Sequence, residues 1–124
     1  MSIMDKPAGD FVKYHRSLLD WEWYHDLPVR VLFLHLMLDV NWKPGRFEGH
    51  DIPPGSVPTS IDKLSAKSGL TRQSVRTALE KLKSTGEITI QATSRFSVVT
   101  LANWEKYQSS GKQSTRQSTQ QSTG

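Results

Sequence analysis

Two short helical segments separated by a single glycine constrain the fold of this chain more than any other feature. They lie in residues 59–86, and the separating residue is Gly69. Ser60 and Thr71 each precede a segment and are expected to cap it, because a short hydroxyl side chain accepts a hydrogen bond from a backbone N–H group of the first helical turn. Gly69 is expected to end the first segment, since glycine adopts a left-handed backbone at little cost. The pattern predicts a helix-turn-helix.

The apolar residues of this region agree with that prediction. Leu64 is expected to face the core from the first segment, and Leu70 to fill the corner between the two segments. The second segment carries one stripe at helical spacing, made of Val75, Ala78, Leu79 and Leu82. Gly86 is expected to end this second helix. Each helix therefore has one face to bury, as two packed helices require.

Two strand-like runs follow directly. Residues 87–92 alternate apolar and polar side chains, residues 96–101 are rich in β-branched residues, and a short polar turn, residues 93–95, joins them. Such a pair of runs predicts a β-hairpin. A hairpin placed directly after the second helix is the wing of a winged helix-turn-helix. The predicted fold class is therefore α+β, mainly helical, a winged helix-turn-helix with a C-terminal β-hairpin wing, and Trp104 and Tyr107 are expected to fold back on the core.

The first half of the chain predicts a further helix. Asp26 is expected to cap it, and apolar residues recur at helical spacing up to about Val40. Its second apolar stripe, on a different side, consists of Val31, Leu34 and Leu38. A helix that is apolar on two sides must be buried twice, by its own domain and by something else. The cover is either the N-terminal segment or a second subunit, and we favour an oligomer interface.

Shorter elements are expected on both sides of that helix. Residues 11–14 alternate like a half-buried strand, and residues 15–20 are typical of a short helix. Residues 43–58 are rich in proline and glycine and predict an irregular hairpin, in which Ser56-Val57 pairs as an edge strand. Phe47 and Ile52 are expected to pack inward from it.

The composition predicts one domain between two flexible ends. A flexible N-terminus (residues 1–10) precedes the domain (residues 11–107), and a disordered tail (residues 108–124), in which Gln-Ser-Thr recurs, follows it. Cysteine is absent, which excludes disulfides and thiolate metal sites. No apolar run reaches the roughly 18 residues of a membrane helix, and the first ten residues lack the apolar core of a signal peptide. These features predict a cytoplasmic protein without a membrane partner.

Positive charge collects in the second half of the chain, where residues 60–107 carry an excess of four and residues 1–59 a deficit of two. An uneven basic surface attracts polyanions. The predicted reading residues, at the start of the second helix of the helix-turn-helix, are Arg72, Gln73, Ser74, Arg76 and Thr77. Arginine pairs with guanine and glutamine with adenine in the major groove of double-stranded DNA. The predicted backbone contacts are Lys67, Thr71, Lys81 and Arg95. The alternative is a solvated polar face, but residues 71–77 contain no acid.

Catalytic motifs are missing from the sequence. It contains no phosphate-binding loop and no nucleophile with a base at motif spacing, and its four histidines are scattered. His25-Asp26 and His50-Asp51 lack further ligands at a recognisable spacing, so no metal or other cofactor is expected. The chain is predicted not to be an enzyme.

Four stretches of the chain resemble a known family. They are Phe-Val-Lys-Tyr-His-Arg-Ser-Leu-Leu-Asp-Trp-Glu-Trp-Tyr (11–24), Leu-Phe-Leu-His-Leu-Met-Leu (32–38), Gly-Ser-Val-Pro-Thr-Ser (55–60) and Ser-Val-Val-Thr-Leu-Ala-Asn-Trp-Glu-Lys-Tyr-Gln (97–108). The resemblance is to the N-terminal winged-helix domain of DnaD-like and phage replisome-organiser proteins, and it spans nearly all of residues 11–108. Its specific parts are Trp-Glu-Trp-Tyr and Asn-Trp-Glu-Lys-Tyr-Gln, because many regulators share the helix-turn-helix.

The resemblance implies a role at replication initiation in a bacterial host, in phage or prophage replication, with the protein associated with the nucleoid. It also implies self-association and contact with replication-initiation or helicase-loading proteins. Members of this kind continue through a polar linker into a helical C-terminal domain. Residues 108–124 are expected to be such a linker, and the helical domain that would follow it has either been removed or is not needed by this protein. The alternatives are a transcriptional regulator of the same fold and a winged-helix module for oligomerisation or protein interaction.

Overall fold

The computed structural model describes residues 11–104. In this range the chain forms three α-helices, one short 3-10 helix and five strands. In chain order they are η2 (Arg16–Asp20), α1 (Leu27–Asp39), β1 (Gly45–Phe47), β2 (His50–Ile52), β3 (Ser56–Thr59), α2 (Ile61–Ser68), α3 (Arg72–Ser84), β4 (Ile88–Ala92) and β5 (Ser97–Leu101). The residues predicted to be a flexible N-terminus and a disordered tail, and Tyr107, lie outside the described residues. None of the helices described is long and apolar enough to cross a membrane.

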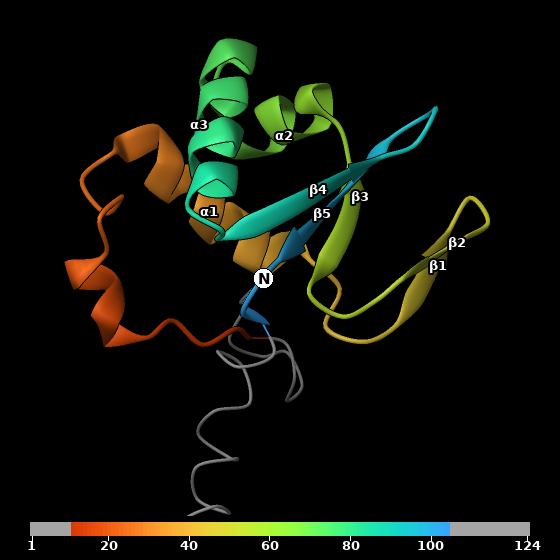
Figure 1. The fold of residues 1–124 in the computed structure, drawn as a ribbon, viewed down its shortest axis with the longest axis horizontal. Coiled ribbons are helices and arrows are strands. Elements are labelled where there is room, and N and C mark those ends of the chain that lie inside the picture. The colour runs from red at the N-terminus through yellow and green to blue at the C-terminus, as the bar shows by residue number, and fades with distance from the viewer. Residues whose placement is uncertain (1–10, 105–124) are drawn as a thin grey trace, which may run out of the picture.

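The strands form two small antiparallel sheets. β1 pairs with β2, and the second sheet has the order β3-β5-β4. β3 contains Pro58 and lies at the edge of its sheet, where a missing backbone N–H group is tolerated. The predicted hairpin is confirmed as β4 and β5, with Ile88 opposite Leu101. Figure 1 shows this hairpin extending away from the helices, with the β1–β2 hairpin alongside it.

The helix boundaries follow the predicted caps. The side chain of Asp26 accepts a hydrogen bond from the Val29 backbone, and those of Ser60 and Thr71 accept from Lys63 and Ser74. Gly69 adopts a left-handed conformation, with φ of 84°, between α2 and α3. Local side-chain chemistry therefore fixes the corner between these two helices.

The core lies where α1, α2 and α3 meet the three-stranded sheet. The stripe predicted for α3 is buried, and so is Leu64 of α2. Other buried apolar residues are Val29, Leu32, Phe33, Leu36 and Met37 of α1, with Ile88, Val99, Leu101 and Trp104. Ile52 is also buried, whereas Phe47 is only partly covered. The result is an α+β arrangement of three helices and two small antiparallel sheets, compatible with a winged helix-turn-helix.

The N-terminal segment departs from the sequence prediction. Residues 11–14 form no strand, so that prediction was wrong. The physical reason is that this segment contacts a helix instead of another strand. The Tyr14 hydroxyl donates a hydrogen bond to the Leu34 carbonyl oxygen (3.1 Å), which places this segment beside α1 and not at a sheet edge. The short helix predicted for residues 15–20 is confirmed as η2.

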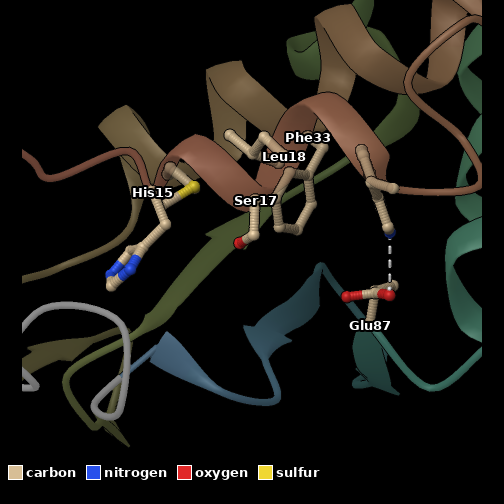
Figure 2. Close-up of a pocket in the computed structure, with 7 residues that line it drawn as sticks. His15, Ser17, Leu18, Phe33 and Glu87 are labelled. Atoms are coloured by element: carbon tan, nitrogen blue, oxygen red, sulfur yellow. Dashed lines mark hydrogen bonds between the residues drawn. The ribbon is translucent and has the colours of Figure 1, made fainter.

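The aromatic residues after η2 join the N-terminal segment to the helices. The Trp21 ring lies 4.7 Å from the Phe33 ring, and its Nε1 donates to Glu87 Oε2 at 3.0 Å. Trp23 Nε1 donates to Thr85 Oγ1, also at 3.0 Å. Figure 2 shows the cavity of about 110 Å³ that remains between η2 and α1, with the Trp21–Glu87 hydrogen bond at its side. These indoles are used in packing.

Candidate nucleic-acid interface

The first two turns of α3 present the predicted reading residues at the surface. Arg72, Gln73, Arg76 and Thr77 are exposed, and Ser74 is partly buried. Gln73 Nε2 donates to Thr77 Oγ1 at 3.3 Å, so these two side chains lie together on the helix. In Figure 1 the start of α3 and the tip of the β4–β5 hairpin lie toward the same edge of the molecule. Contact with DNA requires accessible side chains, and four of the five predicted reading residues are exposed.

Most of the predicted cations already have an acidic neighbour. Arg72 Nε lies 2.8 Å from Asp62 Oδ1, Lys67 Nζ lies 3.3 Å from Asp39 Oδ1, and Arg95 Nε lies 3.3 Å from Glu48 Oε1. In the pairs of Arg72 and Arg95 both side chains are well exposed, and exposed pairs of this kind are worth about 0–1 kcal/mol, whereas Asp39 is mostly buried. A phosphate can therefore replace the carboxylates of Asp62 and Glu48 at little cost.

Arg76 differs from these residues. Within residues 11–104 no carboxylate lies at ion-pair distance from Arg76, or from Lys83 two turns later on the same helix. Both side chains are exposed. They are the cations of α3 that an incoming anion meets without first displacing an acid.

Lys81 is engaged with α1. Its Nζ lies 2.6 Å from Asp26 Oδ2 and 5.7 Å from the centre of the Trp23 ring. The hydrogen bond from Lys81 lowers the pKa of Asp26 from its usual value, and the backbone N–H group of Val29 lowers it further, against the opposing effect of burial. Lys81 therefore joins α3 to the cap of α1, and its predicted phosphate contact stays a prediction.

The tip of the β4–β5 hairpin is built by contacts that the sequence did not reveal. The Thr93 hydroxyl oxygen accepts hydrogen bonds from the backbone N–H groups of Arg95 (3.2 Å) and Phe96 (3.1 Å). The Phe96 ring lies 5.0 Å from the Phe47 ring and 5.3 Å from that of His50. The β1–β2 hairpin thus supports the segment that carries Arg95.

A groove of about 550 Å³ runs between the helices and the sheet. We call it the α3 groove. It is lined by Thr59, Ser60, Ile61, Leu64, Gln73, Arg76, Thr77, Leu79, Glu80, Lys83, Ile90, Ser97 and Val99. The groove was not predicted from the sequence, and neither Glu80 nor Lys83 was predicted to be functional. The available signal was the helical spacing of Arg76, Glu80 and Lys83.

The other predicted surface is the second stripe of α1. Val31 and Leu34 are partly buried, and Leu38 is 64% exposed. Leu27, one turn before Val31, is also exposed. The N-terminal segment lies against part of this stripe through the contact of Tyr14 with Leu34. Leu38 stays exposed and is the part of the stripe that a second subunit could cover.

Among residues 11–104 no three histidine, aspartate or glutamate side chains are grouped closely enough to hold a metal ion. Comparison of the chain with protein-family models, with curated proteins and with solved structures gave no match.

Proposed function

We propose that this chain is a winged helix-turn-helix module that binds double-stranded DNA. In this proposal α3 enters the major groove, where Arg72, Gln73, Ser74, Arg76 and Thr77 meet base edges. Lys67, Thr71 and Arg95 contact the sugar–phosphate backbone, and the β4–β5 hairpin is the wing. Lys81 joins them only if a phosphate displaces Asp26. The observation that carries the proposal is the exposed, cationic start of α3, with Arg76 free of any described carboxylate.

The family resemblance favours a role at replication initiation in a bacterial host. The protein would then be cytoplasmic and nucleoid-associated, would act on phage or prophage DNA, and would contact replication-initiation or helicase-loading proteins. A transcriptional regulator has the same surface. Mapping the bound sites on the host and phage genomes separates the two roles, because an origin indicates initiation and promoters indicate regulation.

Replacing Arg76 with alanine should weaken duplex binding by roughly 1–3 kcal/mol if its guanidinium reads a base. Arg72→Ala should weaken duplex binding by a slightly smaller amount, because Arg72 must first give up its weak ion pair with Asp62. The measurement is a fluorescence-anisotropy titration of labelled duplex at two salt concentrations. Affinity should fall steeply with salt, and losing a phosphate contact should reduce the salt slope by about one.

The matched control is Lys43→Ala, which removes an exposed cation that lies over the Trp42 ring, outside the proposed interface. This variant should bind the duplex like the unchanged chain. Equal affinities for the unchanged chain and both arginine variants would refute the assignment of α3 as the reading helix.

Self-association through α1 is the second candidate function, favoured by the exposed Leu38 beside Val31 and Leu34. Introducing glutamate at Leu34 and Leu38 together should lower the mass seen in sedimentation, because two like charges would have to be buried at the contact. A circular dichroism melt of the same variant shows whether the subunit itself stays folded. A folded variant with unchanged mass would count against this interface.

A further inference from the structure

The α3 groove has an apolar floor that the reading of duplex DNA does not require. The floor is made of the partly exposed side chains of Ile61 and Ile90, from α2 and β4, with the buried Leu79 and Val99 beneath them. Thr59 lies in its wall, only 2% exposed, and its hydroxyl oxygen has no hydrogen-bond partner in the described structure. An apolar floor with a few polar groups around it is the usual make-up of a binding site.

The chemistry of the floor favours a peptide over a nucleic acid. Proteins hold unpaired bases by stacking them on aromatic rings, and the residues that line the groove include no aromatic side chain. A sugar–phosphate backbone gains little from aliphatic contacts. A large apolar side chain of a peptide fills such a groove and removes apolar surface from water on both partners.

The rim of the groove indicates which charges that peptide carries. Arg76 and Lys83 lie at the groove without a carboxylate at ion-pair distance in the described structure, and Glu80 lies between them. Seven residues along a helix span about 10 Å. Side chains on one face of an extended peptide are two residues apart, so acids two positions before and two positions after an apolar residue face the groove together with it. These acids lie about 13 Å apart along the peptide, a spacing that the long side chains of Arg76 and Lys83 can span.

We propose that the α3 groove binds an extended acidic segment of a partner protein, in which a large apolar side chain is flanked by Asp or Glu on both sides. The apolar side chain packs on Ile61 and Ile90, which are only partly buried, and the flanking carboxylates pair with Arg76 and Lys83. Gln73, Arg76 and Thr77 belong both to this groove and to the proposed DNA interface. The chain should therefore be unable to bind the partner segment and duplex DNA at the same time. Only this exclusion rests on the proposed function.

The test is a selection of phage-displayed random peptides on the full chain, without DNA. The recovered peptides should share an apolar residue between acidic residues. A fluorescein-labelled copy of the most enriched peptide then serves as the probe in anisotropy titrations. Arg76→Glu with Lys83→Glu should weaken its binding by about tenfold or more, since two attractive pairs become repulsive. The matched control Lys43→Glu should bind it normally.

A charge-swapped probe, with lysine in place of its acidic residues, should bind the doubly substituted chain better than the unchanged chain. Ser97→Trp places a large ring in the groove from β5 and should block the probe without changing the charge. Enriched peptides that lack acidic residues, or equal binding to the doubly substituted chain and the control, would overturn the proposal. So would binding of single-stranded oligothymidine with the same dependence on Arg76 and Lys83 when no peptide binds.

The exclusion is tested separately by adding unlabelled peptide to a labelled duplex bound to the chain. Displacement at peptide concentrations near its own Kd supports one shared surface. Simultaneous binding of peptide and duplex contradicts the exclusion. A chain that binds the peptide and no duplex at all refutes the proposed DNA function while the peptide site stands, so the two failures are distinguishable.

Discussion

Gly55→Ala should lower the free energy of unfolding by roughly 2–5 kcal/mol, the sum of a backbone cost and a packing cost. Gly55 has φ of +86°, a region that side chains with a Cβ rarely adopt. A Cβ at this position would lie 2.9 Å from Trp104 Cβ and 3.1 Å from its Cγ. The Gly55 backbone cannot move away easily. Its N–H group donates to the Asn41 carbonyl (2.7 Å), and its carbonyl accepts from the Leu101 N–H group (2.8 Å).

Gly49→Ala separates the two causes. Gly49 has a similar φ of +82°, but no atom lies within 4 Å of the Cβ that alanine would add. This variant should therefore lose only the backbone term, about 1–2 kcal/mol. Urea unfolding followed by circular dichroism measures both changes. Equal losses for the two variants would mean that Trp104 does not close the core against Gly55.

Leu36→Ala should lower the free energy of unfolding by roughly 2–5 kcal/mol, because it leaves a cavity among residues that pack closely. Leu36 is completely buried on the inner face of α1, where the core cluster includes Leu32 and Leu82. The loss should appear as a lower midpoint of urea unfolding with little change in slope.

The control is Leu38→Ala on the same helix, measured at a concentration at which the chain sediments as a single subunit. Leu38 is exposed, so removing its side chain should change the stability by no more than about 0.5 kcal/mol. A loss as large as that of Leu36→Ala would show that another part of the same chain covers Leu38.

The elements that could be predicted are those whose boundaries are set by residues nearby in the sequence. Ser60, Gly69 and Thr71 act on their own helix ends, so α2, α3 and the corner between them could be predicted from the sequence. The β4–β5 hairpin likewise has two strand-like runs and a short turn next to one another. The extended segment at residues 11–14 was mistaken for a strand because its contact, the Leu34 carbonyl, lies on α1, twenty residues away from Tyr14.

The candidate site likewise has features set by local sequence, which could be predicted, and features set by distant residues, which could not. The exposure of Arg72, Gln73 and Arg76 follows from the apolar stripe on the opposite face of α3 and could be predicted. The acids beside Lys67 and Arg95, which are Asp39 and Glu48, come from α1 and the β1–β2 turn, so no local pattern signals them. The α3 groove draws on residues from Thr59 to Val99 and exists only once the sheet has packed beside the helices.

The two indoles that follow η2 make the chain its own optical probe. Trp21 and Trp23 donate their ring N–H groups to Glu87 and Thr85, which form the joint between α3 and β4. An indole changes its emission when it loses a polar acceptor or gains contact with water. A ligand whose binding breaks either hydrogen bond should therefore alter the intrinsic fluorescence, so that its binding can be followed on the unlabelled protein.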